Sequence, residues 1–147
     1  MNADQKTKLA TELAKPEYTG LADYQAKADY INTTASPDKF RKVEYNDVVA
    51  YLTYREKIVG IKNAAATNAF AEELLFLAIQ TKLERFDLNL APTATSVNRL
   101  LDGLVAATLI DAADKTFILS MADMPISEAL GLGTVKWNNI RDIEVGA

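Results

Sequence analysis

The sequence predicts an all-α protein: a single compact domain over residues 1–147, built from about five to seven short helices with one extended connector. Three observations carry this prediction. Apolar residues recur at helical spacing in the second half of the chain, capping residues and glycines mark helix ends, and no two segments alternate as a strand pair would. A chain of 147 residues that is 49% hydrophobic has the size and apolar content of one ordinary domain.

The clearest helix begins near residue 97. Its apolar residues recur at i, i+3, i+4, i+7 and i+8, which places them along one helix face; they are Val97, Leu100, Leu101, Leu104 and Val105. Ser96 precedes this stripe and is expected to cap the helix by accepting a backbone N–H. Gly103 lies inside the helix, where glycine costs about 1 kcal/mol relative to alanine. A close helix–helix contact at Gly103 would offset that cost.

Further start and stop signals follow this helix. Asp111 is expected to cap a second helix, with Asp114 in its first turn, where the helix dipole favours a negative charge. Pro125 lacks an N–H and should break or restart the helix, so that residues 126–130 form a short one. It is expected to end at two glycines that can adopt the left-handed conformation, Gly131 and Gly133.

For the first part of the chain, the sequence predicts two helices, a loop, a connector and a third helix. Helices are expected over residues 4–14 and 21–31, followed by a polar loop over residues 32–38. Residues 40–45 alternate only imperfectly and are interpreted as the extended connector. Asn46 is expected to cap the third helix.

Two segments complete the assignment. Residues 63–84 are rich in helix-forming residues and are expected to form a nearly buried helix. Residues 86–92 are interpreted as an extended linker or at most one short strand. No tract in the sequence is long enough to divide the chain into domains.

Composition narrows the functional classes. The chain has no cysteine and no histidine, so disulfides, thiolate chemistry, a Ser-His-Asp triad and the usual zinc sites are excluded. The formal charge is −4, which argues against free nucleic-acid binding. No apolar run approaches the roughly 20 residues that span a bilayer, so no membrane association is expected. We expect a protein that is not an enzyme, with no catalytic residue, no cofactor and no metal.

The acidic residues and the glycine loop have simple structural interpretations. Glu72 and Glu73 point about 100° apart on a helix and do not form a two-carboxylate site. Asp102, Asp111 and Asp114 are a weak metal candidate, because helix capping already explains two of them. The segment GLGTV lacks the longer pattern of a phosphate loop. A hydrolase that uses only carboxylates, with Asp87, Asp102, Asp111 and Glu128 as candidates, remains an alternative of another class.

Aromatic residues are the candidate protein interface. Tyrosine and tryptophan are favoured at interfaces, but both also occupy the half-buried rim of small cores. The candidate interface residues are Tyr18, Tyr24, Tyr30, Tyr51, Tyr54 and Trp137. Trp137 has two interpretations. The favoured one places it in the core of the domain beside the helix over residues 97–105, and the other makes it an anchor for a neighbouring subunit.

Several segments of the chain match a sequence pattern that is known from other proteins. One group comprises FDLNLAP, VNRLLDGLVAATLIDAADKTFILSMA and SEALGLGTVKWNNIRDI, and the other is LATELAKPEYTGLADYQAKADYINT near the N-terminus. Together they resemble a family of small proteins encoded by tailed bacteriophages. The family pattern includes "LVAAGVLT" followed by "SRAEELGLG-x-VT-x-x-DV". The chain departs from it at Ala22, where the family has a capping Ser or Thr, at Glu128, which directly precedes Ala129, and at Lys136-Trp137, where the family has Thr-Pro.

The resemblance implies a phage origin and a component of the virion, made in the host cytoplasm. It implies no catalytic residue. The expected function is a structural subunit that docks onto a ring or tube in the tail or the head–tail (neck) region. The implied partners are other phage structural proteins, with homo-oligomers possible in the assembled particle. The alternative is a phage accessory protein, such as an assembly chaperone or a regulator, that is not retained in the virion.

Overall fold

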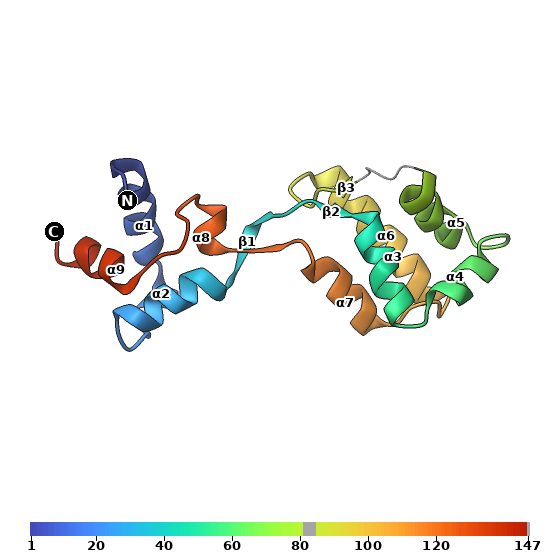
Figure 1. Ribbon diagram of the computed structural model, residues 1–147, viewed down its shortest axis with the longest axis horizontal. Helices are drawn as coiled ribbons and strands as arrows, with labels where there is room; N and C mark the ends of the chain where they lie inside the picture. Colours follow the sequence, from blue (N-terminus) through green and yellow to red (C-terminus); the bar gives the residue numbers. More distant parts are fainter. Residues whose placement is uncertain (81–84, 147) are drawn as a thin grey trace. The chain divides into compact units, whose positions relative to one another are not determined.

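The computed structural model describes residues 1–80 and 85–146 (Figure 1). Within these residues the chain forms nine α-helices, a 3-10 turn, a π-helical segment and two small two-stranded sheets. The prediction of a mostly helical protein is therefore confirmed. The all-α prediction is wrong in detail, because short strands are present and the helices outnumber the predicted five to seven. No helix among the described residues is long and apolar enough to cross a membrane.

The contacts divide the chain into two compact units. The first comprises Met1–Lys39 and Met124–Ala147, and the second comprises Phe40–Asp123. Each unit has its own cluster of buried apolar side chains. The assignment of residues 1–147 to one domain stays a prediction.

The first unit consists of helices from both ends of the sequence. Its elements are α1 (Ala3–Leu13), the 3-10 turn η1 (Pro16–Tyr18), α2 (Tyr24–Thr33), α8 (Ile126–Ala129) and α9 (Trp137–Glu144). Asn2 caps α1 through a reciprocal pair of hydrogen bonds with Gln5, and Asp23 caps α2. Helix α2 packs against α8 and α9, and α1 also packs against α9. The core between them includes Leu9, Ile31 and Ile140.

The second unit is organised around the long helix α6 (Ala91–Ala106), which packs against α5 and α7. The remaining elements are α3 (Tyr45–Tyr54), α4 (Ile58–Ala64), α5 (Ala69–Leu75), the π-helical segment η2 (Phe76–Gln80) and α7 (Ala112–Ser120). Strands β2 (Val43–Glu44) and β3 (Arg85–Phe86) pair antiparallel, with Val43 opposite Phe86. The connector predicted over residues 40–45 therefore contains a strand, and the short strand allowed for residues 86–92 begins one residue earlier.

The prediction of a polar loop over residues 32–38 is wrong. Strand β1 (Ala35–Phe40) pairs with β4 (Asp123–Pro125), and both chain crossings between the units lie in these strands. Backbone hydrogen bonds extend the pairing: the Ile126 N–H donates to the Thr34 carbonyl at 3.0 Å. The pairing partner lies about ninety residues away in the sequence, so the local turn-forming composition of residues 32–38 gave no sign of it.

The apolar stripe of α6 is confirmed, since Val97, Leu100, Leu101 and Leu104 are all buried. The expected cap at Ser96 is wrong. The helix begins five residues before Ser96, with Leu90 at the N-cap and a proline in the first turn, where its missing N–H is not needed. The expected cap at Asn46 is also wrong, because α3 begins at Tyr45.

The C-terminal signals are confirmed. Asp111 caps α7 through a reciprocal box with Asp114. Helix α8 ends at Ala129, and Gly131 and Gly133 have φ angles of 70° and 65°, in the left-handed region. The helix predicted over residues 63–84 is interrupted, since Asn68 caps a new helix, α5. The last four residues of that prediction, 81–84, lie outside the described part.

Candidate functional site

The clearest candidate site lies on α3 and α7 in the second unit. Tyr51, Tyr54 and Arg55 are spaced i, i+3 and i+4, so they share one face of α3. The aromatic ring of Phe117 on α7 stacks on Tyr51, with ring centroids 4.3 Å apart and planes 19° apart. We call Tyr51, Tyr54, Arg55 and Phe117 the aromatic surface. It contains two of the tyrosines that the sequence predicted as interface residues.

A buried carboxylate holds this surface in place. The Tyr51 hydroxyl donates to Asp114 Oδ1 at 2.9 Å, and Arg55 Nε donates to the same oxygen at 2.9 Å. The other oxygen of Asp114 accepts the Asp111 backbone N–H at 3.1 Å, which closes the capping box of α7. Arg55 also lies 3.6 Å from the Asp111 carboxylate. Two side chains of α3 are thus fixed to the first turn of α7.

The charge of Asp114 is stabilised although its side chain is 0% exposed. Burial alone raises the pKa of Asp114, but hydrogen bonds from the Asp111 backbone, from Arg55 and from Tyr51 outweigh it and lower the pKa below its ordinary value. Burial and the hydrogen bond to Asp114 raise the pKa of Tyr51. The hydrogen bond to Asp114 raises the pKa of Arg55. At neutral pH the group is therefore a carboxylate, a neutral phenol and a guanidinium.

This arrangement orders side chains that remain available to solvent. Tyr54 is 84% exposed and Phe117 is 49% exposed. Tyrosine and arginine are the residue types that most often dominate binding energy at protein interfaces. Because Tyr51 and Arg55 are already held by Asp114, a partner would not have to immobilise them, and less conformational entropy would be lost on binding.

The candidate interface tyrosines of the first unit are buried or half-buried. Tyr18 is 1% exposed and donates from its hydroxyl to Glu12 at 2.9 Å, so it belongs to the core and not to a surface. Burial, followed by the hydrogen bond to Glu12, raises the pKa of Tyr18. The ring of Tyr30 meets that of Tyr18 edge-on at 5.2 Å, and Tyr24 and Tyr30 are half-buried. The core-rim interpretation describes these two residues, and interface contacts by them stay a prediction.

The core interpretation of Trp137 is wrong. Trp137 is 47% exposed at the first position of α9, and the Arg141 guanidinium lies 5.3 Å from its ring centroid. Ile140, which follows three residues later, is the side chain of α9 that enters the core. The helix over residues 97–105 belongs to the other unit. The role of Trp137 as an anchor for a neighbouring subunit stays a prediction.

The interface predicted from the sequence includes Tyr51 and Tyr54 but not the three residues that complete the site, namely Arg55, Asp114 and Phe117. The sequence places Asp114 in the first turn of a capped helix, and the structure confirms this. The spacing Asp114-x-x-Phe117 places both residues on one helix face, as does Tyr51-x-x-x-Arg55. No local pattern, however, shows that these two faces meet.

The three aspartates that the sequence offers as a weak metal site, Asp102, Asp111 and Asp114, have other partners. Lys115 pairs with Asp102, while Asp111 and Asp114 bind each other's backbone and Arg55. In the part of the chain that the structure describes, no three histidine, cysteine or acidic residues are grouped so that they could hold a metal ion.

Comparisons of the chain with protein-family models, with curated proteins and with solved structures found no match.

Proposed function

We propose that this protein is a non-enzymatic structural subunit of a tailed-phage particle, located in the tail or the head–tail (neck) region. It is made in the host cytoplasm and taken up into the virion. It docks onto other phage structural proteins or onto copies of itself, and the aromatic surface of the second unit makes the contact.

The observation that carries the docking role is the exposure of Tyr54 beside side chains that are already fixed. Tyr54 is 84% exposed, although burying a tyrosine ring is among the larger apolar gains available to a small protein. Arg55 on the same helix face is locked by Asp114. An exposed aromatic next to a pre-ordered arginine has the composition of an interface hot spot. The phage assignment itself rests on the sequence resemblance.

The test measures the protein in particles of the phage that encodes it. Cells are infected with phage that encode the wild-type protein, Tyr54→Ala or Leu90→Ala. The purified particles are then analysed by quantitative mass spectrometry. Leu90 is a matched control, because it is also a large exposed apolar residue of the second unit, at 57% exposure, outside the aromatic surface. We expect the wild type and Leu90→Ala at equal copy number, and Tyr54→Ala reduced at least severalfold at equal expression in the cell.

Two results would count against the proposal in different ways. Absence of the wild-type protein from particles would overturn the structural role and favour the accessory protein. Equal incorporation of Tyr54→Ala would overturn the assignment of the contact to the aromatic surface.

A further inference from the structure

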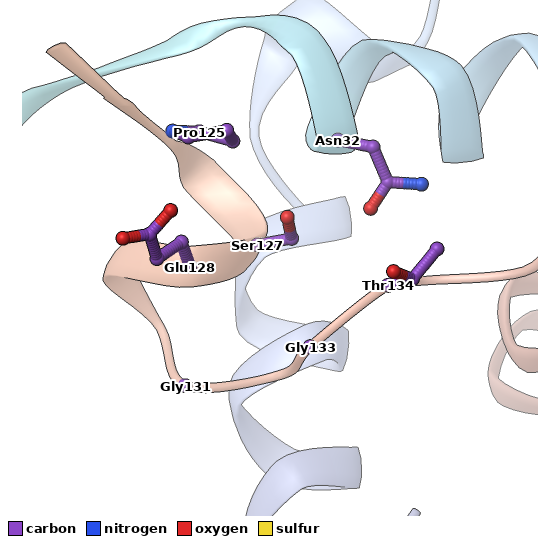
Figure 2. A pocket seen from close by; sticks show the side chains of 7 residues that line it. All are labelled: Asn32, Pro125, Ser127, Glu128, Gly131, Gly133 and Thr134. Carbon is purple, nitrogen blue, oxygen red and sulfur yellow. The ribbon is translucent and has the colours of Figure 1, made fainter.

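The open cavity of the first unit does not bring its polar groups together. It has a volume of about 500 Å³ and lies beside the loop that follows α8 (Figure 2). The Asn32 amide on its wall already pairs with both backbone groups of Val135. The side chains of Ser127 and Glu128 point in different directions in Figure 2, so they do not converge on one ligand.

A different surface lies along α6 in the second unit, where an open groove has a volume of about 770 Å³. Phe70 of α5 lines this groove together with one side of α6. Four of the lining residues of α6 are exposed, and we call them the outer face of α6: Thr95, Arg99, Asp102 and Ala106. Their spacing places them on one side of the helix, opposite the buried stripe. The longest helix of the second unit therefore presents a continuous face to solvent.

The spacing of the outer face is that of a seam between two paired helices. Its residues follow one another at steps of four, three and four, which is an average repeat near 3.5 residues. This is the repeat at which two helices pack side by side. Thr95 and Ala106 are small, so they allow a second helix to approach closely. Arg99 and Asp102, in the middle of the face, carry opposite charges.

The order of these residues makes the outer face complementary to itself. When two α6 helices pair antiparallel about a twofold axis, Arg99 meets Asp102 of the second copy, and Asp102 meets Arg99 of the second copy. The same register places Thr95 opposite Ala106 of the second copy. A parallel pair would place like charges against each other at both positions, which is repulsive. The charge order therefore selects the antiparallel pair.

The contacts within the chain leave both charged groups able to bind a second copy. Arg99 lies over the Phe70 ring and 3.6 Å from the Glu73 carboxylate, and its guanidinium makes no hydrogen bond with a described residue. Asp102 accepts Lys115 Nζ through Oδ1, whereas its Oδ2 accepts no hydrogen bond from the described part of the chain. A guanidinium has five donors and a carboxylate about four acceptor positions. Because Glu73 and Lys115 balance the two charges, two copies meet without net repulsion, and no existing contact has to be lost.

We propose that the outer face of α6 binds the outer face of a second copy of this chain, as an antiparallel helix pair. Two exposed ion pairs add little affinity but fix the orientation. We therefore expect a weak dimer in solution, which is favoured where copies are concentrated in an assembly. The proposal does not rest on the phage assignment, and the described lining of the groove includes no residue of the aromatic surface.

Disulfide trapping tests the orientation, because the chain has no cysteine of its own. Thr95→Cys and Ala106→Cys are purified separately, one of them with an affinity tag, and are mixed in a glutathione redox buffer. In the antiparallel pair, the thiol at position 95 of one copy faces the thiol at position 106 of the other, whereas equal positions lie about 16 Å apart along the helix axes, too far for a disulfide. We expect the mixed disulfide to form severalfold faster than either homodisulfide. Thr11→Cys, at an exposed helical threonine of the first unit, replaces Ala106→Cys in the control and should give no such preference.

Charge reversal tests the two ion pairs. Both charges of the outer face are negative in Arg99→Glu and positive in Asp102→Arg, so each variant repels its own copies. We expect dimerisation, measured by sedimentation equilibrium, to weaken at least about tenfold in each variant alone. A mixture of the two variants should associate at least as tightly as the wild type, because every charge then meets its opposite. Lys62→Glu is the matched control, because it makes the same charge change at an exposed residue of α4 that does not line the groove. It should dimerise like the wild type.

Three results would overturn the proposal. A wild type that stays monomeric at every concentration, with a statistical mixture of trapped disulfides, would remove self-association through this face. Faster formation of the homodisulfide of Thr95→Cys would contradict the antiparallel register. No recovery in the mixture of Arg99→Glu and Asp102→Arg, while both variants keep the circular dichroism spectrum of the folded chain, would remove the reciprocal ion pairs.

Discussion

The ring of Phe70 on α5 occupies the space that a Cβ atom on Gly103 of α6 would need. The glycine allows the two helices to approach closely, and the Arg99 guanidinium, one turn earlier on α6, lies 5.7 Å from the Phe70 ring centroid. The close contact expected at Gly103 from the sequence is therefore confirmed, and Phe70 is the residue that makes it.

Gly103→Ala should destabilise the protein although alanine is the better helix former. Helix propensity favours alanine by about 1 kcal/mol. Overpacking of a fitted contact costs about 1–3 kcal/mol, so we expect a net loss measured by urea unfolding. Phe70→Leu should relieve part of this loss in the double variant, because the smaller side chain leaves room for the methyl group. A gain in stability from Gly103→Ala alone would mean that the ring moves away freely.

Local signals in the sequence predicted several of the helices and some of their ends. The burial of Leu101 and Leu104, the cap at Asp111 and the left-handed Gly131 and Gly133 all follow from patterns within a few residues. Such features depend on one helix or one turn, so neighbouring residues determine them.

The features that the sequence did not predict join distant parts of the chain. Strand β1 is stabilised by a partner about ninety residues later, and Arg55 meets Asp114 across 59 positions. Both arise from tertiary packing, which overrides local preference. The sequence predicts two tyrosines of the candidate site, Tyr51 and Tyr54, but not the buried Asp114 that orders it.

The buried carboxylate of Asp114 should make stability depend on acid pH. Its pKa is lower in the folded protein than the ordinary value of about 4 expected for the unfolded chain. The carboxylate therefore stabilises the fold above about pH 4, and this contribution is lost as the pH falls through the folded pKa. We expect Asp114→Asn to lower the free energy of unfolding by about 1.5–3 kcal/mol at pH 7 and by less below pH 4.

Asp123→Asn is the control for this experiment, because it removes an exposed acid. Its free energy of unfolding should follow that of the wild type at every pH. A gap between Asp114→Asn and the wild type that stays constant down to pH 2 would contradict the role of the ionised carboxylate.

Leu104→Ala should cost about 2–5 kcal/mol, because Leu104 is fully buried in the core of the second unit. The variant also tests the single-domain prediction. The only tryptophan lies in the first unit, so its fluorescence reports on that unit, whereas far-UV circular dichroism reports on both. One cooperative domain predicts that both signals change at the same, lowered denaturant concentration. A fluorescence transition that does not respond to Leu104→Ala would show that the units unfold independently.

Thr108 should be a site where glycine stabilises the protein. It follows the end of α6 with a φ angle of 58°, a conformation that costs a residue with a Cβ about 1–2 kcal/mol. Thr108→Gly removes this cost but adds freedom to the unfolded chain, so we expect a net gain of about 0.5–1 kcal/mol. Gly131→Ala, at a φ angle of 70° with open space around it, should show the opposite sign. Equal effects of the two substitutions would contradict this account.

Trp137 should report on docking of the first unit. Its side chain is 47% exposed and lies against Arg141, so the isolated protein should show emission typical of a partly hydrated indole and quenching by acrylamide or iodide. If Trp137 anchors a neighbouring subunit, assembly onto the particle should shift the emission to shorter wavelength and protect it from the quencher, because the indole leaves water. Arg141→Lys keeps the charge but removes the planar group that lies over the ring, and should increase quenching in the free protein. Emission that is already blue-shifted and protected in the isolated chain would contradict the exposed position, and emission unchanged by assembly would leave the anchor role without support.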